Sequence, residues 1–257
     1  MKTVLVTGAA AGLGHYLTLS YVKKGYTVFA LDIDEKNLQN LPKENILPIK
    51  MDISSPADWD TVVVPEIEKL GKGLDIVIAC ASVMHLGSAE TCPEAEWNKV
   101  NSINLTGQYL TAKKTLPFLQ QNKGNILFIG SPSGLLAVPD EVCYVTFKHA
   151  VRGLSKSVAI DFGSAGVRAN VVHPGWMRTV MSDKEMEEIM ANEHCSLDEA
   201  YLRATRFVPL RRPGNLEEIW NAIDFLTSDK ASYITGAELT VDGGLTVVDP
   251  GMVAFER

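Results

Sequence analysis

Short apolar runs alternate with longer amphipathic runs along almost the whole chain, and this alternation limits the folds open to it. Several of the short runs are rich in Val, Ile and Leu without polar alternation, as expected of strands that are covered on both faces. Repeated strand–helix units of this kind predict an α/β fold with a doubly wound, seven-stranded parallel sheet flanked by helices. The predicted strands are Thr3–Thr7, Thr27–Asp32, Ile46–Met51, Asp75–Cys80, Asn125–Gly130, Arg168–His173 and Glu238–Val241.

The amphipathic runs between these strands predict the helices. They are Leu13–Lys24, Pro56–Lys69, Pro93–Leu119, Tyr144–Phe162 and Leu216–Thr227. No repeat, low-complexity tract or linker interrupts the 257 residues, so we expect a single domain over 1–257. The stretch 179–207 is charged and contains methionines. Because it lies between two strands of the sheet, we expect it to form a substrate lid.

Charge and cysteine content narrow the classes of partner. The chain has 24 Lys and Arg against 31 Asp and Glu, a formal net charge of −7, which argues against nucleic acid or an anionic membrane. The N-terminus enters a strand-like run at once, so we expect no signal peptide or membrane span and a cytoplasmic location. Four cysteines without CxxC spacing and five histidines without metal-ligand spacing predict neither disulfides nor a bound metal.

A glycine-rich turn follows the first strand, in Thr7-Gly8-Ala9-Ala10-Ala11-Gly12-Leu13-Gly14. Glycine lets the backbone approach a pyrophosphate closely, and the N-terminus of the next helix adds N–H donors and partial positive charge. The spacing is G-x3-G-x-G, yet its place between a first strand and a helix predicts dinucleotide binding. The expected contacts are Gly8, Ala11, Gly12, Leu13 and Gly14.

Asp32 ends the second strand, where a carboxylate can hydrogen-bond the adenosine ribose hydroxyls. It would also repel a 2′-phosphate, since unit charges about 4 Å apart interact by roughly 4 kcal/mol at an effective dielectric of about 20. The turn offers Ala10 and Ala11 instead of an arginine, so we expect NAD over NADP. Asp52 and Ile53 follow the third strand and either flank the adenine or form a surface turn.

Tyr144 and Lys148 lie four positions apart on a predicted helix and therefore share a face. Hydride exchange at a carbinol carbon needs a proton moved on the oxygen, and a free tyrosine with a pKa of about 10 is a poor base near pH 7. An ammonium about 4 Å away supplies roughly 4 kcal/mol, enough to lower that pKa by about 3. We therefore expect Tyr144 to act as general acid/base and Lys148 to lower its pKa.

From its second residue to about residue 247, the chain resembles a classical short-chain dehydrogenase/reductase. The matching motifs are TGxxxGxG at Gly8, Gly12 and Gly14, YxxxK at Tyr144 and Lys148, a serine 13 positions before the tyrosine at Ser131, the helix asparagine at Asn104, Pro174–Thr179, and Val241–Gly244. The resemblance implies a single-domain Rossmann fold and an NAD-preferring oxidoreductase. It also implies a homotetramer that pairs helices like Pro93–Leu119 and Tyr144–Phe162.

The resemblance further assigns roles. Ser131 would hydrogen-bond the substrate oxygen, Lys148 would also hold the nicotinamide ribose, and Asn104 would position a water that relays protons from Lys148. Residues Pro174, Gly175, Met177 and Thr179 would border the nicotinamide, with Thr179 at its carboxamide. Where the family usually reads Asn-Asn-Ala-Gly, this chain has Ala79-Cys80-Ala81-Ser82, and Ala81 is the backbone contact expected there.

The substrate pocket is expected at the carboxyl ends of the strands. Its expected walls are mainly apolar: Met84, Leu86, Ser133, Leu135, Val138, Val142, Trp176 and Met181–Met190, with His85 as a weaker candidate. These walls favour a hydrophobic or cyclic secondary alcohol or its ketone. Residues Arg178, Arg203 and Arg206 would serve a carboxylate or thioester-linked acid, or simply form a solvated lid face.

Two alternative functions stay open. One is a 3-oxoacyl-thioester reductase, for which NADP and a basic surface would be expected. The other is a nucleotide-sensing binding protein without turnover, which the Ala79–Ser82 departure supports and the intact Ser131, Tyr144 and Lys148 oppose.

Overall fold

A computed structural model of the chain describes residues 1–249 and residue 251. Its strands form one parallel sheet in the order β3-β2-β1-β4-β5-β6-β7. They are β1 Thr3–Thr7, β2 Thr27–Asp32, β3 Ile46–Lys50, β4 Ile76–Ala79, β5 Asn125–Ile129, β6 Arg168–Pro174 and β7 Glu238–Val241. The predicted doubly wound sheet is confirmed, and strand ends agree within one residue. Because the chain order reverses between β1 and β4, a ligand site is expected at that point of the sheet.

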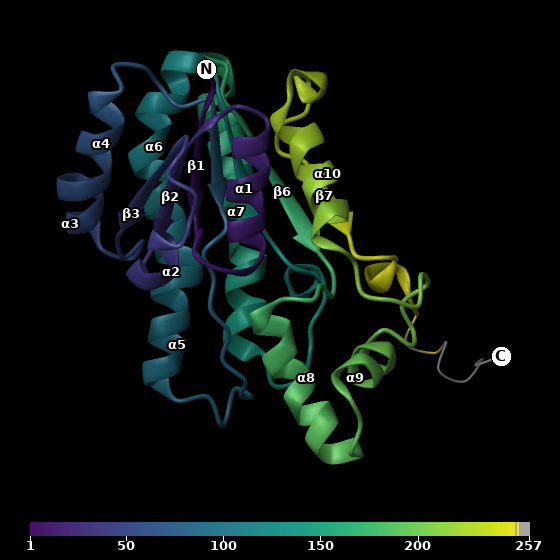
Figure 1. Cartoon of the computed structure of the whole chain (residues 1–257). Helices are drawn as coiled ribbons and strands as arrows, with labels where there is room; N and C mark the ends of the chain where they lie inside the picture. The colour runs from purple at the N-terminus through teal and green to yellow at the C-terminus, as the bar shows by residue number, and fades with distance from the viewer. Residues whose placement is uncertain (250, 252–257) are drawn as a thin grey trace.

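Helices cover both faces of the sheet (Figure 1). They are α1 Gly12–Lys23, α2 Glu35–Gln39, α3 Pro56–Asp58, α4 Val64–Lys69, α5 Glu94–Asn101, α6 Gln108–Asn122, α7 Val142–Phe162, α8 Val180–Glu193, α9 Leu197–Ala204 and α10 Leu216–Thr227. The sequence did not predict α2, whose five residues are too few for a periodic pattern. None of the helices in the described residues combines the length and the apolar character that a membrane span needs.

The two helical layers bury opposite faces of the strands. On one side Leu17 of α1 and Ile223 of α10 pack in a cluster that contains Val4 and Val6 of β1. On the other side Leu5 of β1 joins the cluster formed by α4, α6 and α7. Since successive strand residues point to opposite faces, both sets must be apolar. This arrangement explains why the strands read as unbroken apolar runs.

Two helices predicted as continuous are interrupted by π-helical turns. Trp59–Val63 separates α3 from α4, and Ser102–Gly107 separates α5 from α6. At Gly107 a Cβ would lie 2.6 Å from Ile53 Cδ1, so any larger residue would force the Ile53 side chain to move from its place in the segment after β3. Single π turns inside helices are frequent at functional sites, and the second one carries Asn104.

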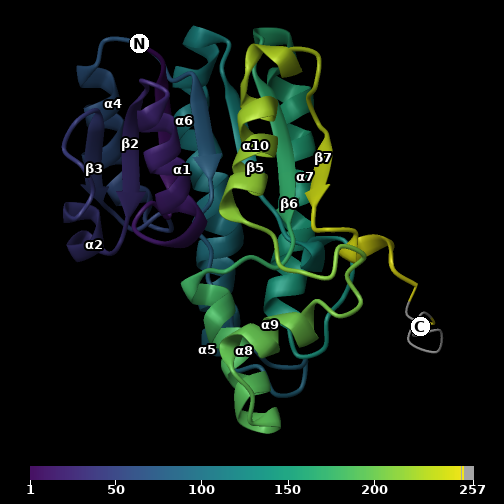
Figure 2. The same ribbon diagram turned by 45° about the vertical axis from the view of Figure 1, so that its right-hand side comes forward.

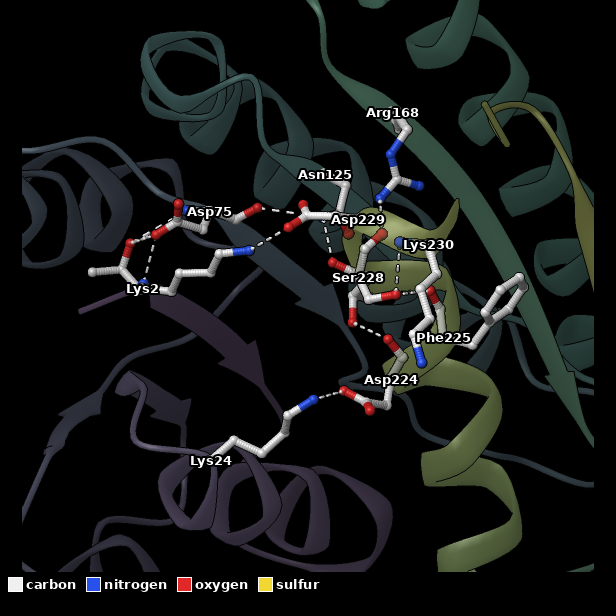
Figure 3. Close-up of polar contacts among 12 residues, drawn as sticks. Lys2, Lys24, Asp75, Asn125, Arg168, Asp224, Phe225, Ser228, Asp229 and Lys230 are labelled. Atoms are coloured by element: carbon white, nitrogen blue, oxygen red, sulfur yellow. Dashed lines mark hydrogen bonds and ion pairs between the residues drawn. The ribbon is translucent and has the colours of Figure 1, made fainter. Parts of the chain in front are cut away.

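At the amino ends of the strands, polar side chains tie the sheet to the end of α10 (Figure 3). Asn125 Nδ2 donates to Thr227 O at 3.2 Å, and Arg168 donates to Leu226 O at 2.9 Å and to Ser228 O at 3.3 Å. These bonds satisfy carbonyls at the end of α10 that have no partner within the helix. Because these contacts lie at the amino ends of the strands, they do not occupy the carboxyl ends, where a ligand site is expected.

The stretch 179–207 extends beyond that carboxyl end (Figures 1 and 2). It contains no strand, as expected, but folds as α8 and α9, which the sequence did not predict. Thr179 Oγ1 accepts from Ser182 N at the start of α8, and Ser196 forms a capping box with Glu199 at the start of α9. A separate small cluster around Met186 and Tyr201 holds the two helices together.

Candidate active site

A cavity of about 460 Å³ lies at the carboxyl ends of β1, β4, β5 and β6. Residues from the glycine turn, the loop after β4, the segment after β5, α7 and α8 line it. The cavity therefore contains the point at which the strand order reverses, as the fold leads one to expect.

The glycine turn forms one end of this cavity. Gly8 adopts φ +72°, and a Cβ on it would lie 2.9 Å from Ala81 Cα. A Cβ on Gly14 would lie 2.0 Å from Gly8 O, so the start of α1 presses directly on the turn. The first turn of α1 contains no acidic residue to offset its partial positive charge. The glycines leave a space that side chains would otherwise fill, next to a helix N-terminus without acidic side chains. Such a space suits a pyrophosphate.

Most residues expected to contact the cofactor line the same cavity: Gly8, Ala11, Gly12, Leu13, Gly14, Asp32, Ala81, Tyr144, Lys148, Pro174, Gly175, Met177 and Thr179. Asp32 accepts hydrogen bonds from Ala10 N at 2.9 Å and Asp34 N at 3.0 Å, so it also fastens the glycine turn to β2. Asp52 and Ile53 are not among the lining residues. Asp52 accepts from Ser54 N, and Ile53 O accepts from Trp59 Nε1, as in a local turn.

Lys148 is almost completely buried on α7. Its Nζ donates to Ile129 O at 2.8 Å and lies 5.4 Å from the centre of the Tyr144 ring. Burial lowers the pKa of Lys148 to about 8. A Cβ on Gly134 would lie 2.8 Å from Lys148 O, so a glycine lets the segment after β5 pack against this turn of α7.

The pKa of the Tyr144 phenol is raised, chiefly by burial, and nearby Glu185 and Glu141 add to the rise. The Ser131 and Ser82 hydroxyls act in the opposite direction. The expectation that Lys148 lowers this pKa is wrong for the protein alone. Because burial lowers the pKa of Lys148 to about 8, half of the ammonium groups have lost their charge at that pH. The amine also donates its hydrogen bond to Ile129 O. A bound positive charge beside the ring would lower the pKa of the phenol further than the two hydroxyls do.

Ser131 follows β5, and its backbone is held by His173 of the neighbouring strand β6, a residue that the sequence motifs did not indicate. His173 is fully buried in β6. Its Nδ1 lies 2.8 Å from Ser131 O and 3.2 Å from Ser131 N, and its Nε2 lies 3.2 Å from Glu238 Oε2. Burial lowers the pKa of His173. A Cβ on Gly130 would lie 2.5 Å from the ring, so glycine there makes room for it.

Asn104 fixes the loop after β4. Its Oδ1 accepts from Val83 N at 2.9 Å and its Nδ2 donates to Val83 O at 2.8 Å. Gln108 donates to Ala81 O at 2.6 Å, and Thr7 Oγ1 accepts from Ala81 N at 3.1 Å. The loop is thus held without the family's two asparagines. Asn104 is not a lining residue, and its role in a water relay stays a prediction.

Two carboxylic acids that the sequence motifs did not indicate as site residues line the cavity. Glu141 precedes α7 and accepts from Ser133 Oγ at 2.8 Å, and Glu185 comes from α8. Burial raises the pKa of both acids; with Glu141 nearby, that of Glu185 reaches about 7. The helical spacing of Glu185 from Met181, i to i+4, is the one sequence signal that could have placed it on the cavity side.

The expected apolar walls are confirmed in part. Lining residues include Met84, Ser133, Val138, Trp176 and Met181, whereas Leu86, Leu135, Val142 and His85 do not line the cavity. Leu86 is 47% exposed, and His85 Nδ1 lies 3.6 Å from Glu96 Oε2. Leu136 lines the cavity in place of Leu135.

The three lid arginines point to other partners. Arg178 pairs with Asp198, Arg203 pairs with Glu193, and Arg206 stacks on the Phe207 ring. None of them lines the cavity. In this arrangement they do not offer a cationic site for a substrate carboxylate.

A family model described as enoyl-(acyl carrier protein) reductase matches residues 8–246. Among curated proteins, 3-oxoacyl-[acyl-carrier-protein] reductase FabG of Thermotoga maritima is 32% identical over 96% of this chain and 98% of its own length. A 3-alpha-(or 20-beta)-hydroxysteroid dehydrogenase of Mycobacterium bovis is 31% identical over 95% of this chain and 88% of its own. Protein MoaE of Klebsiella aerogenes is 49% identical, but the match spans only 59% of each chain.

Solved structures agree with this fold. Aldohexose dehydrogenase of Thermoplasma acidophilum superposes with a TM-score of 0.89 at 29% identity, over 97% of this chain and 95% of that one. A 4-hydroxyisoleucine dehydrogenase complexed with NADH gives a TM-score of 0.85 at 28% identity, over 97% of this chain and all of that one.

Proposed function

The chain belongs to the short-chain dehydrogenase/reductase family of oxidoreductases, and from this premise we propose that it is an NAD-dependent enzyme that interconverts a secondary alcohol and its ketone. One observation carries the proposal. Ser131, Tyr144 and Lys148 line the same cavity as the glycine turn and Asp32. A proton-transfer group and a dinucleotide cradle therefore share one space.

When bound, a nicotinamide cofactor accepts a hydride from the carbinol carbon or returns one to the carbonyl carbon. The protein's own task is the proton on the oxygen. Tyr144 takes that proton during oxidation and gives it back during reduction. The Ser131 hydroxyl holds the substrate oxygen beside the phenol, and His173 fixes the Ser131 backbone.

The cofactor's parts match particular residues. The turn at Gly8, Gly12 and Gly14 would hold the pyrophosphate, Asp32 the adenosine ribose and Thr179 the carboxamide. Asp32 supports NAD over NADP because a 2′-phosphate would lie against its carboxylate. The NADH complex of the 4-hydroxyisoleucine dehydrogenase is in keeping with this choice.

The substrate follows from the cavity walls. Met84, Val138, Trp176 and Met181 offer an apolar surface that suits a hydrophobic or cyclic alcohol. Glu141 and Glu185 make an anionic substrate unfavourable, since either acid would repel it once ionised. The similarity to a hydroxysteroid dehydrogenase is consistent with a bulky apolar alcohol.

A second candidate is reduction of a 3-oxoacyl thioester, favoured by the 32% identity with FabG over nearly the full chain. Asp32 weighs against it because such a reductase would be expected to use NADP, whose 2′-phosphate the carboxylate repels. Arg178 and Arg203 also weigh against it, because they are paired with acids and are not free to bind an anionic acyl carrier. The formal charge of −7 opposes it in the same way.

The test is a panel of alcohols, ketones and 3-oxoacyl thioesters with NAD(H) and NADP(H), followed by the absorbance of the reduced nicotinamide. We expect the highest kcat/KM with NAD and a cyclic or bulky secondary alcohol. Tyr144→Phe should lower kcat by about 10²-fold or more. The matched control is Tyr109→Phe, at an exposed tyrosine of α6.

Three other outcomes would contradict the proposal, each in a different way. A Tyr144→Phe enzyme as fast as the wild type would remove the phenol from the mechanism. Preference for a 3-oxoacyl thioester with NADPH would establish the second candidate instead. Cofactor-dependent thermal stabilisation without turnover on any substrate would identify a nucleotide-binding protein that has lost catalysis.

A further inference from the structure

Ser82 lies in the loop after β4 and lines the catalytic cavity. The residues on either side of it are fixed, because Gln108 donates to Ala81 O and Asn104 bonds both backbone polar atoms of Val83. The loop therefore cannot rotate Ser82 out of the cavity without breaking three hydrogen bonds. The position is one at which the family pattern usually has glycine, and hence no side chain.

The Ser82 hydroxyl is buried and has no hydrogen-bond partner of normal geometry among the described residues. Leaving a buried hydroxyl unpaired costs free energy, so native proteins seldom keep such a group without a use for it. Ser82 and Tyr144 line the same cavity, and the Ser82 hydroxyl favours the ionised phenol, as the Ser131 hydroxyl does. Two serine hydroxyls, from the ends of β4 and β5, thus approach one phenol oxygen.

We propose that Ser82 is a second hydroxyl donor of the proton-transfer site, whose O–H hydrogen-bonds the Tyr144 oxygen once the phenol has lost its proton. The inference rests on the proposed function. In oxidation the phenolate oxygen takes the proton of the carbinol hydroxyl while the carbinol carbon gives up a hydride to the cofactor. Ser82 keeps its own proton throughout and stabilises only the charged form of Tyr144.

The surroundings of Tyr144 explain the need for a second donor. Burial opposes ionisation of the phenol, and so do Glu185 of α8 and Glu141 before α7. Lys148 on α7 lies 5.4 Å from the centre of the Tyr144 ring, and its ammonium donates a hydrogen bond to Ile129 O. Among the described residues, Ser131 at the end of β5 is the other hydroxyl that favours the phenolate. Ser82 adds a second hydroxyl donor from the loop after β4.

The pH dependence of kcat/KM for alcohol oxidation tests this role. Removal of the hydroxyl in Ser82→Ala or Ser82→Gly should raise the pH midpoint of the rising limb by about one pH unit, since one hydrogen bond to the charged form is lost. Ser82→Thr retains a hydroxyl and should return the midpoint towards that of the wild type. Ser155→Ala is the matched control, because Ser155 Oγ is also buried without a partner but lies outside the cavity.

A second readout does not need turnover. With ¹³C-labelled tyrosine, the Cζ resonance of Tyr144 can be assigned by its loss in Tyr144→Phe and titrated in the NAD-bound protein. Its midpoint should rise in Ser82→Ala and not in Ser155→Ala. If the wild type shows no turnover, the proposed function fails while this titration still decides the role of Ser82.

Two results would overturn the inference. One is an unchanged midpoint in both Ser82→Ala and Ser82→Gly, in the rate profile or in the titration. The other is a change confined to the Kd of NAD, which would show that the hydroxyl serves the cofactor and not the phenol. A thermal midpoint equal to that of the wild type confirms that each variant is folded.

Discussion

The side chains around Tyr144 shift the pKa of its phenol in opposite directions. Burial and the two acids favour the neutral phenol, whereas the Ser131 and Ser82 hydroxyls favour its ionised form. Spacing in the sequence identifies Tyr144 and Lys148 as a pair, but spacing carries no information on burial. It therefore could not show that burial raises the pKa of the phenol in the protein without cofactor, and it could not reveal Glu185, which belongs to another helix.

Glu185 should make the protein less stable as the pH rises. Its folded-state pKa is raised from 4.5 to about 7, so between these values the folded protein binds more protons than the unfolded chain. The free energy of unfolding therefore falls as pH rises from about 4.5 to about 7 and is level above that window. Glu185→Gln should remove this loss and be more stable than the wild type at pH 8, by about 1–3 kcal/mol, but not at pH 4.

Urea unfolding at the two pH values measures this difference. Glu188→Gln is the matched control, because Glu188 lies on the same helix but is exposed. An equal free energy of unfolding for Glu185→Gln and wild type at pH 8 would show that Glu185 is not buried beside Glu141 and Tyr144.

Asp32 should decide the choice between cofactors. Asp32→Ala removes the negative charge that a 2′-phosphate would meet, so the ratio of kcat/KM with NAD to that with NADP should fall by about tenfold or more. It also removes an acceptor for Ala10 N, so some loss of stability is expected with both cofactors. Asp34→Ala, two residues further on, should leave the ratio unchanged. A wild-type enzyme that prefers NADP would contradict the assignment.

Among the elements, the loop after β4 and the start of α7 both contribute residues to the cavity and touch each other through two cysteines. Cys92, at the far end of that loop, and Cys143, on α7, are free thiols whose Sγ atoms lie 3.1 Å apart. Cys143 precedes Tyr144 directly. The sequence shows two unrelated cysteines 51 positions apart, and only the packing of α5 and the loop against α7 brings them together.

Mild oxidation should form a disulfide between Cys92 and Cys143 and so link the loop to α7. A disulfide has an S–S distance of about 2.0 Å, so the two sulfurs need to move by only about 1 Å. Hydrogen peroxide would take two electrons and two protons from the thiols and leave as water. The number of free thiols should then fall from four to two.

Peptide mapping without reductant should show the Cys92–Cys143 link. Cys92→Ser should abolish it, whereas Cys195→Ser should leave it intact. If all four thiols survive the treatment in the folded wild type, the loop does not lie against α7 as described.

For the whole molecule, the prediction concerns assembly. The resemblance implies a homotetramer built on α6 and α7, and both helices expose apolar side chains: Ile160 on α7 is 82% exposed and Tyr109 on α6 is 46% exposed. Side chains of this kind are commonly buried by a partner subunit. Light scattering should therefore give about four times the 28.0 kDa mass of one chain.

Ile160→Asp should lower that mass towards a dimer or monomer, since a carboxylate would be buried in the interface. Val62→Asp, at an exposed valine between α3 and α4, is the control and should not change it. A wild-type mass of 28.0 kDa at high protein concentration would contradict the proposal.

The sequence by itself determined the sheet, the glycine turn and the pair Tyr144 and Lys148. These features depend on local backbone geometry and on periodicity, which neighbouring residues encode. The tertiary structure alone decided the rest. Burial set the direction of the Tyr144 pKa, and the pairing of β6 beside β5 in the sheet placed His173 against Ser131. The position of α8 at the carboxyl end of the sheet brought Glu185 to the cavity. Each of these depends on segments far apart in the chain, whose contacts no local pattern records.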